Sequence, residues 1–418
     1  METLTIATID RPLEAVVRPP GSKSITNRAL VVAALATGGV SRLDGALDAD
    51  DTKVMREALH RFGVMIDDVD DPWLVLGTGG KLSAPGRIDV GASGTSARFL
   101  TALAALVPGT TTIDGTPRMR KRPIGELAVA LESLGVAVET TDGCPPVTVT
   151  GGALGGGRVA VEASRSSQFV SALLLVAPMA ETPLVVEAPR LVSAPYVQTT
   201  LEVMQAFGAE VEGCGDECWR VEPTGYRTAH FDIEADASAA VYPLVAAAIL
   251  GGVVAVEGIP ASSTQADLRI VEVLEAMGCS VWHRDARLVV SGPSRRLEAV
   301  DVDMNSAPDA VLGLAVACLF ADGPSRIRNV GNLRLKETDR LAALVTELRR
   351  VGGDARVEGD DLVVIPGEIR PATVRTYDDH RMAMSFALVG LARPGIVIED
   401  PSCVDKTWPG YFDMLAAL

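Results

Sequence analysis

Eight short polar clusters contain the side chains of this sequence that could do chemistry. The first runs from Pro20 to Arg28 and reads PGSKSITNR. Its Pro-Gly turn and Ser caps predict a helix start, where free N–H groups beside Lys23 and Arg28 suit a phosphate or carboxylate. The other clusters span residues 91–98, 117–123, 164–169, 305–310, 332–340, 377–382 and 405–409. Together they predict binding of a ligand with several negative charges.

Each cluster also has an ordinary structural explanation. Asp309 stands at the start of an apolar stretch, where a carboxylate usually caps a helix. The charges of residues 332–340 could form solvated ion pairs that stabilise little. Four cations between Pro117 and Pro123 would repel one another unless something anionic lies beside them. Arg340, Arg381 and Lys406 would also repel one another without an anion between them. Both sets of cations therefore favour an anionic ligand.

A repeat of about 70 residues places the clusters in register. Six stretches are apolar on every side, and each precedes a short strand that ends in residues such as Leu43-Asp44-Gly45 or Ile398-Glu399-Asp400. A fixed long period indicates one copied supersecondary unit, and a helix that is apolar all round must be buried. Arg28, Arg98, Gln168, Asp309 and Arg381 stand at the same point of their units, so we expect them at buried helix starts.

After each strand comes an amphipathic helix that ends at a glycine, as at Gly63, Gly135 and Gly208. Short alternating strands follow. Each unit therefore reads strand, buried helix, strand, exposed helix, strand. The fold class is α/β: two inside-out α/β domains of three βαβαβ-type units each.

The length of 418 residues favours two or three domains. We predict an N-terminal domain over residues 20–235. A C-terminal domain would comprise residues 1–19 plus 236–418, completed by the N-terminal strand at residues 3–9. The chain would then cross between domains twice, which predicts a hinge. Helix starts gathered on one face of each domain would oppose each other across a cleft.

Composition excludes several classes of protein. A net charge of −16 repels nucleic acid and anionic membranes. We expect no secretory signal, because METLTIATID lacks a basic region and an apolar run. We also expect no membrane span, because no apolar run reaches about 20 residues. The six Cys are scattered, and no metal-ligand spacing appears. We expect free thiols, no metal, and a cytoplasmic monomer.

With these motifs in place, the chain resembles the 5-enolpyruvylshikimate-3-phosphate (EPSP) synthases, or 3-phosphoshikimate 1-carboxyvinyltransferases. The match runs end to end through PGSKSITNRAL, GTSAR, PRMRKRPIG, SSQF, VSAPY, NSAPDA, NLRLKETDRL, DDHRMAM and KTWPGYF. The resemblance implies two inside-out domains that close on substrate. It also implies transfer of enolpyruvyl from phosphoenolpyruvate to the 5-hydroxyl of shikimate 3-phosphate, in aromatic amino acid biosynthesis, without a cofactor.

The resemblance also implies which residues bind each substrate. Those for shikimate 3-phosphate are Lys23, Ser24, Arg28, Ser166, Ser167, Gln168, Ser193, Tyr196, Asp309, Asn332 and Lys336. Those for phosphoenolpyruvate are Lys23, Gly94, Arg122, Gln168, Arg340, Arg381 and Lys406. The implied catalytic residues are Asp309, Glu337 and Lys23, with Asp309 accepting the hydroxyl proton and Glu337 protonating the methylene carbon.

One position departs from the family pattern. Many members have Asn where this chain has Ala92, so one hydrogen bond to phosphoenolpyruvate is in doubt, and with it the sensitivity to glyphosate.

Two alternative functions remain. The sister enzyme acting on UDP-N-acetylglucosamine has a reactive Cys in a loop where this chain has residues 116–121 and no Cys. A non-catalytic anion-binding protein of the same fold would release no phosphate from the two substrates.

Overall fold

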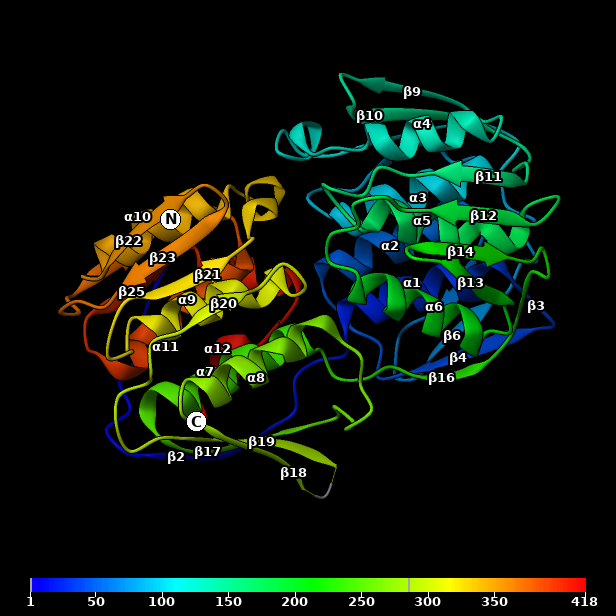
Figure 1. The fold of residues 1–418 in the computed structure, drawn as a ribbon. Helices are drawn as coiled ribbons and strands as arrows, with labels where there is room; N and C mark the ends of the chain where they lie inside the picture. Colours follow the sequence, from blue (N-terminus) through cyan, green and yellow to red (C-terminus); the bar gives the residue numbers. More distant parts are fainter. Residues whose placement is uncertain (1, 285) are drawn as a thin grey trace. The chain divides into compact units, whose positions relative to one another are not determined.

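The structure, a computed structural model, describes residues 2–284 and 286–418. The chain divides into two compact units (Figure 1). The N-terminal unit is Gly21–Ile233, and the C-terminal unit is Met1–Pro20 with Glu234–Leu418. The boundaries expected from the sequence differ from these by one and two residues. Met1 and Asp285, which fall in the predicted C-terminal domain, lie outside the described residues.

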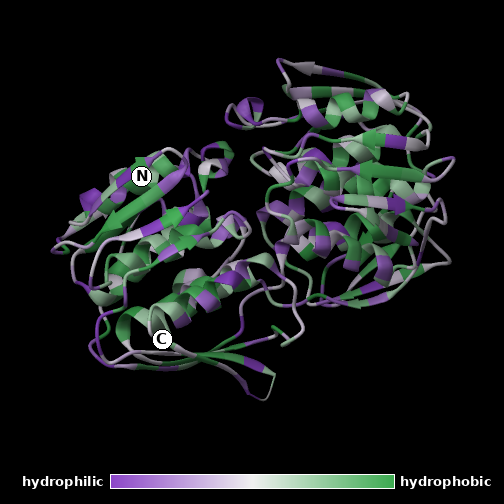
Figure 2. Cartoon of the chain, in the orientation of Figure 1, coloured by the Kyte–Doolittle hydropathy of each residue, from purple (hydrophilic) through white to green (hydrophobic). Residues whose placement is uncertain are grey.

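Each unit is built around three helices that are apolar all round, as the sequence predicted. Their residues form one hydrophobic core per unit, and Figure 2 shows these helices mainly in the hydrophobic colour. Small side chains allow them to pack closely: Ala29, Ala33 and Ala34 are fully buried. The buried helices are α1 (Lys23–Leu35), α3 (Gly94–Ala105), α5 (Gln168–Val176), α7 (Ala237–Leu250), α9 (Val311–Cys318) and α11 (His380–Ala392).

The helices of a second set are amphipathic, and each buries only one of its faces. Five of them stop just before a glycine in the left-handed region, such as Gly63 (φ 95°) and Gly352 (φ 109°), where the missing Cβ removes the steric penalty. The predicted helix ends are therefore confirmed. These helices are α2 (Asp50–Arg61), α4 (Gly125–Ser133), α6 (Pro195–Ala206), α8 (Arg269–Ala276), α10 (Arg340–Arg350) and α12 (Tyr411–Ala416).

Six sheets repeat one pattern of pairing. In each, a first strand runs parallel to a second, and the second pairs antiparallel with a third. Five of the sheets add a fourth strand by a hairpin. The expected unit had one closing strand, and this is corrected to two in the five sheets where the closing strands form a hairpin.

The N-terminal unit has three four-stranded sheets and one two-stranded pair. They are β16-β4-β6-β5 (His230–Asp232, Val40–Asp44, Trp73–Leu76, Met65–Asp67), β7-β8-β10-β9 (Gly86–Asp89, Gly109–Asp114, Cys144–Gly151, Ala137–Thr141) and β11-β12-β14-β13 (Gly157–Ala160, Leu184–Glu187, Cys218–Val221, Val211–Gly215). A two-stranded pair joins β15 (Tyr226–Arg227) to β3 (Ala36–Thr37).

The C-terminal unit has three sheets. They are β2-β17-β19-β18 (Leu13–Val17, Gly252–Glu257, Arg287–Gly292, Ser280–Arg284), β20-β21-β23-β22 (Asp301–Asp303, Ser325–Arg328, Asp361–Ile365, Asp354–Glu358) and β1-β25-β24 (Thr3–Thr5, Ile396–Glu399, Ala372–Val374). The N-terminal segment thus supplies strands to two sheets of this unit: β1 pairs with β25, and β2 pairs with β17.

The two chain crossings lie next to each other. The backbone N–H of Asp236 donates to the carbonyl of Pro20 at 2.8 Å. Pro20 directly precedes the first point where the chain passes between units, and Asp236 follows the second. This hydrogen bond ties together the two segments through which the chain passes between the units.

The expectation of free thiols is wrong for one pair. Cys214 and Cys218 form a disulfide across the β13–β14 hairpin, with Cα atoms 5.2 Å apart. That spacing lies within the range a disulfide requires. The four-residue separation of the two cysteines is short enough to place both thiols at one turn. The expectation of free thiols rested instead on the reducing conditions of the cytoplasm. Cys144, Cys279, Cys318 and Cys403 are free.

Candidate active site

The first two turns of α1, α3 and α5 meet in the N-terminal unit. The Arg28 guanidinium lies over the Phe99 ring at 5.2 Å, and its Nη2 donates to Ser171 Oγ at 3.3 Å. Gln168 Nε2 donates to Thr95 Oγ1 at 3.2 Å. These residues stand within two turns of the starts of three helices, so the predicted gathering of helix starts is confirmed inside this unit.

Arg28 is a buried cation held by neutral groups. Its Nε donates to Thr200 Oγ1 at 2.8 Å, Nη1 to the Ser24 carbonyl at 2.8 Å and Nη2 to the Tyr196 carbonyl at 3.1 Å. No carboxylate of the described residues forms an ion pair with it. Burial lowers the pKa of Arg28 to about 10, against a smaller opposing effect of Tyr196. A buried charge without a counter-ion is unfavourable, so an anion beside Arg28 would be strongly attracted.

Gly94 is required by the two guanidiniums packed against it. A Cβ at this position would lie 2.5 Å from Arg98 Nη1 and 2.5 Å from Arg122 Nη2. Arg98 Nη1 donates to the Gly94 carbonyl at 2.9 Å, and Arg122 Nη1 donates to the Ala92 carbonyl at 3.3 Å. The backbone at the start of α3 is therefore lined by two cations that a side chain would push away.

Lys23 and the serine cluster border the same helix starts. Lys23, the first residue of α1, forms an ion pair with Asp51 at 3.0 Å. Ser166 Oγ accepts a hydrogen bond from the Gln168 backbone N–H at 3.2 Å, as part of the cap of α5. Ser193 has a left-handed backbone (φ 54°).

The basic segment between Pro117 and Pro123 is partly neutralised by the chain itself. Arg120 makes a bidentate pair with Asp114, at 2.8 and 2.7 Å, and Arg87 reaches the same carboxylate at 2.6 Å. The pair lowers the pKa of Asp114, with the Arg120 hydrogen bond as the largest cause. The expectation that these cations need an outside anion is therefore wrong for Arg120. Arg122 is buried beside Gly94 instead.

In the C-terminal unit, Asp309 is the centre of a charge network. It lies in the short 3-10 helix Pro308–Ala310 that leads into α9. Its carboxylate meets Arg340 Nη1 at 2.9 Å, Arg381 Nη2 at 3.1 Å and Lys336 Nζ at 3.3 Å. Residues from three parts of the sequence, each predicted for the site, therefore converge on one carboxylate.

Two further carboxylates complete this network. Asp379, the N-cap of α11, accepts from Arg340 Nε at 2.7 Å and Nη2 at 3.1 Å. Glu337 lies 2.9 Å from Arg340 Nη2 and 3.5 Å from Lys406 Nζ. The argument that Arg340, Arg381 and Lys406 need an outside anion is therefore corrected: carboxylates of the chain already lie between them.

The network fixes the ionisation of its members. Burial alone would raise the pKa of Asp309, but Arg381, Lys336 and Arg340 hold it well below its usual range. Burial opposes the charge of both arginines. Asp309 nevertheless raises the pKa of Arg381 above its ordinary value, and Asp379 does the same for Arg340. At neutral pH Asp309 is thus an ionised carboxylate with both oxygens directed at cations.

Asn332 adds an acceptor that nothing in the described residues satisfies. It lies in the 3-10 helix Gly331–Leu335, next to Lys336. Its side-chain oxygen is buried and accepts no hydrogen bond. Buried polar atoms are rarely left without a partner, so this oxygen is suited to accept from a ligand hydroxyl.

Sequence reasoning missed several groups that hold the network in place. Tyr242, on α7, has its hydroxyl 3.4 Å from Arg381 Nη1, and burial raises its pKa to about 12. Asp267 is buried, accepts from Ser238 Oγ, and has its pKa raised to about 6 by burial and by Asp309. Asp379 stood inside the DDHR motif but was given no role. Asp267 lies between helices, where no sequence period marks it.

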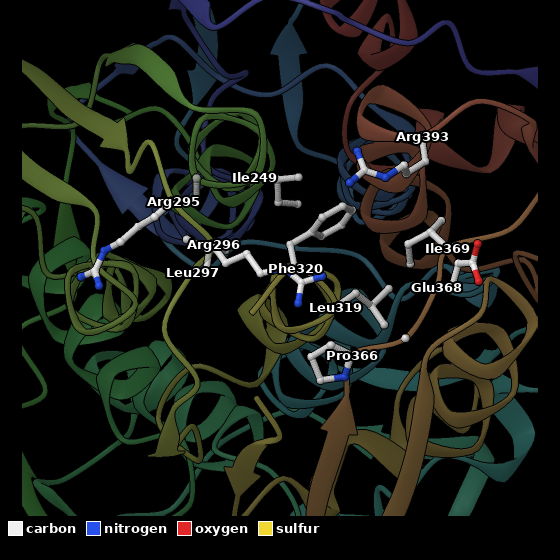
Figure 3. A pocket seen from close by; sticks show the side chains of 12 residues that line it. Ile249, Arg295, Arg296, Leu297, Leu319, Phe320, Pro366, Glu368, Ile369 and Arg393 are labelled. Atoms are coloured by element: carbon white, nitrogen blue, oxygen red, sulfur yellow. The ribbon is translucent and has the colours of Figure 1, made fainter. Parts of the chain in front are cut away.

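A cavity of about 670 Å³ lies at the other end of the buried helices of the C-terminal unit (Figure 3). Ile249 near the end of α7, Phe320 after α9, and Arg393 after α11 line it. Arg393 Nη1 donates to the Ala392 carbonyl at 2.6 Å. Cations at helix C-termini pair with unsatisfied carbonyls, which explains this arginine without a ligand. None of the predicted site residues lines this cavity.

Three side chains of the described residues lie close enough to share a metal ion: Asp44, His230 and Asp232. Both oxygens of Asp44, however, accept from Arg42 at 2.8 and 2.6 Å. His230 Nε2 lies 2.6 Å from Asp44 Oδ2. The group is an ion-pair cluster on β4 and β16.

Comparison with known proteins identifies the family. The family model for EPSP synthase (3-phosphoshikimate 1-carboxyvinyltransferase) matches residues 7–415. The chain belongs to the EPSP synthase family. It is 44% identical to the 3-phosphoshikimate 1-carboxyvinyltransferase of Nostoc punctiforme, covering 99% of this chain and 98% of the relative. It is 45% identical to that of Rhizobium leguminosarum bv. trifolii, covering 99% and 97%.

Solved structures agree with this EPSP synthase assignment. The structure of EPSP synthase from Acinetobacter baumannii superposes with a TM-score of 0.83 at 26% identity, covering 100% of this chain and 98% of that one. The fold class expected from the repeat is thereby confirmed. Within residues 2–284 and 286–418, every helix is too short or too polar to cross a lipid bilayer.

Proposed function

We propose that this chain transfers the enolpyruvyl group of phosphoenolpyruvate to the 5-hydroxyl of shikimate 3-phosphate, giving 5-enolpyruvylshikimate 3-phosphate and phosphate. The family assignment supports the reaction. The single observation that supports the site is the ionised Asp309 surrounded by Arg340, Arg381 and Lys336. A carboxylate held unprotonated at neutral pH can accept the proton of an attacking hydroxyl.

The proposed addition step has two proton transfers. The 5-hydroxyl attacks C2 of phosphoenolpyruvate and gives its proton to Asp309, while C3 gains a proton from Glu337 with Lys23 as a further catalytic group. The tetrahedral adduct then loses phosphate from C2 and one proton from the C3 methyl group, which leaves an enol ether. Glu337 lies beside Arg340 and Lys406, two of the residues proposed for phosphoenolpyruvate, which supports its place near the methylene carbon. Neighbouring cations favour the ionised form of a carboxyl, so its role as proton donor requires that substrate binding alter these surroundings.

The two substrates are proposed to share Lys23 and otherwise to use different cations. For shikimate 3-phosphate, the proposed residues are Lys23, Ser24, Arg28, Ser166, Ser167, Gln168, Ser193, Tyr196, Asp309, Asn332 and Lys336. For phosphoenolpyruvate, they are Lys23, Gly94, Arg122, Gln168, Arg340, Arg381 and Lys406. The buried Arg28, paired only with neutral groups, favours a doubly charged phosphate beside it. The crowded guanidiniums at Gly94 favour a small carboxylate or phosphate.

Phosphate release is the direct test of this function. Purified chain with both substrates should release inorganic phosphate, and omission of either substrate should abolish the release. Asp309→Asn, which keeps the size of the side chain and removes its charge, should release little. Asp339→Asn is the matched control, because Asp339 only caps α10 by accepting from the Ala342 N–H at 3.1 Å and Asn caps equally well. No release from the parent chain would support a non-catalytic binding protein.

The same assay separates the sister reaction. Replacing shikimate 3-phosphate by UDP-N-acetylglucosamine should give no phosphate. The free cysteine of the N-terminal unit, Cys144, does not resemble a reactive thiolate, because burial raises its pKa. Release with the nucleotide sugar but not with shikimate 3-phosphate would instead favour the sister activity.

We further propose the sequence-derived domains, 20–235 and 1–19 plus 236–418, as bodies that rotate about the two crossings. The hydrogen bond between Asp236 and Pro20 supports adjacent crossings. Small-angle scattering should then give a smaller radius of gyration when shikimate 3-phosphate is added. An unchanged radius at saturation would contradict the hinge. The expected monomeric state and cytoplasmic location stay predictions, which sedimentation and cell fractionation can test.

A further inference from the structure

The segment that leads into α11 has a strained backbone. Tyr377 and Asp378 both adopt left-handed conformations, with φ of 58° and 56°. Neither residue is glycine, so each conformation is unfavourable and persists only where the surroundings hold it. The next residues are Asp379 and then, after His380, Arg381. The strain therefore lies directly before two members of the charge network.

Glu347 holds one end of this segment. It lies on α10 and is fully buried. Its Oε1 accepts from the Tyr377 hydroxyl at 2.7 Å, and its Oε2 accepts from the Arg375 backbone N–H at 3.2 Å. Arg350 Nε, at 2.7 Å, balances the charge. A buried carboxylate is thus used to hold both the backbone and the side chain of the strained segment.

Arg340 holds the other end. It is seven residues before Glu347, so the two side chains lie on the same side of α10. Arg340 binds Asp379 through two hydrogen bonds, and Asp379 Oδ1 also accepts from the Arg381 N–H at 3.0 Å. The segment from Arg375 to Asp379 is therefore fixed along α10 at two points.

We propose that Glu347 and Tyr377 are positioning residues for phosphoenolpyruvate binding. By holding the strained turn, they fix the start of α11 and so direct Arg381 and Asp379 toward Asp309 and Arg340. This inference rests on the proposed function, because it assigns Arg340 and Arg381 to phosphoenolpyruvate. Neither positioning residue belongs to the charge network itself. Burial and the bond to Glu347 raise the pKa of Tyr377 to about 12, so its hydroxyl remains a donor at working pH.

Tyr377→Phe is the sharpest test, since it removes one hydroxyl and keeps the ring. We expect KM for phosphoenolpyruvate to rise about fivefold to twentyfold, with kcat and the Kd of shikimate 3-phosphate within about twofold of the parent. Hydrogen exchange of the peptide over residues 372–384 should become faster. Both changes follow if the turn loses its hold on the start of α11.

Tyr226→Phe is the matched control. Tyr226, in the N-terminal unit, is buried and its hydroxyl donates to the Leu175 carbonyl at 2.9 Å. Its removal deletes a hydrogen bond of the same kind and should leave KM for phosphoenolpyruvate unchanged. Equal KM values for the two variants would overturn the inference.

Glu347→Gln gives an independent measurement. The amide keeps the shape and can accept from Tyr377, but loses the charge that draws in the Arg375 N–H. We expect an increase in KM in the same direction as for Tyr377→Phe, and a parental KM would overturn the role of Glu347. A parent chain without turnover would overturn the proposed function, and this inference with it. A parent with turnover and unchanged variants would overturn this inference alone.

Discussion

Two arginines on corresponding buried helices, Arg28 on α1 and Arg381 on α11, are stabilised in opposite ways. Arg28, in the N-terminal unit, donates only to hydroxyl and carbonyl oxygens, and burial lowers its pKa. Arg381, in the C-terminal unit, faces Asp309 and has its pKa raised. One repeat unit has thus given rise to a cation without a counter-ion and to a cation inside an ion-pair network.

The difference indicates how the two units divide their work. A cation paired with neutral groups gains most when an anionic ligand arrives, so Arg28 suits binding. A network with its own carboxylates gains less from an anion but contains groups that can accept or donate protons. Asp309 and Glu337 both lie in the C-terminal unit. We therefore expect the loss of Arg28 to impair binding and the loss of Asp309 to impair turnover.

The largest expected effect is on turnover when Asp309 is removed. Asp309→Ala should lower kcat by about a hundredfold to ten-thousandfold, since loss of one general base typically has this effect. Affinity for shikimate 3-phosphate should fall much less. Steady-state kinetics and calorimetry measure the two quantities, with Asp339→Asn as control. Turnover within threefold of the parent would exclude Asp309 as the base.

The second prediction compares how much the two arginine environments contribute to the free energy of unfolding. Arg340→Met leaves the buried Asp379 without its partner, so we expect the free energy of unfolding to fall by about 3–5 kcal/mol. Arg28→Met removes hydrogen bonds to neutral groups, and Thr200 can still donate to Ser171, at 2.8 Å in the parent. We expect a loss of only about 1–2 kcal/mol. Equal losses in urea titrations would contradict the comparison.

The third prediction concerns pH and Asp267. Its pKa of about 6, raised by burial and by Asp309, lies above the unfolded value near 3.9. The folded state therefore binds the extra proton, so the contribution to stability is full below about pH 4 and is lost as pH rises to about 6. The loss is up to about 3 kcal/mol.

Asp267→Asn should remove this slope. Urea titrations of the parent and the variant between pH 4 and pH 7 measure the difference in their unfolding free energies. That difference should grow in favour of Asn as pH rises, then level off above about pH 6. A constant difference across this range would show that Asp267 does not titrate there.

The last prediction concerns Lys406. Lys406→Met should weaken phosphoenolpyruvate binding about tenfold to a hundredfold, because it removes one charge-assisted contact of about 1.5–3 kcal/mol. Shikimate 3-phosphate, measured alone by calorimetry, should bind almost as before. If the variant weakens shikimate 3-phosphate most, the assignment of the two anions to different cations is wrong.

Much of the fold followed from pattern. The six apolar stretches became buried helices, and the amphipathic helices stopped at Gly63 and its counterparts, because burial and backbone sterics act locally. The closing hairpins were missed, since a short strand and its hairpin partner have similar alternation. The disulfide between Cys214 and Cys218 was missed because compartment was weighed above distance along the chain.

The site was predictable only in part. The motifs pointed to Asp309, Arg340 and Arg381, which meet in the structure. They did not indicate that Asp379 neutralises Arg340 or that Asp114 neutralises Arg120. Arg340 and Asp379 are 39 residues apart in the chain. Arg120 and Asp114 are six residues apart, a separation that matches no helix or strand period, so no local pattern encodes either pairing.

The sequence by itself determined the repeat, the positions of the buried helices and the residue types at their starts. These depend on period, capping and burial, which neighbouring residues specify. Only the tertiary structure decided which charges became partners, and hence that Arg28 stays without a carboxylate while Arg381 faces Asp309. The physical reason is that ion pairing depends on distances of 3 to 4 Å between side chains, which packing sets and sequence spacing does not.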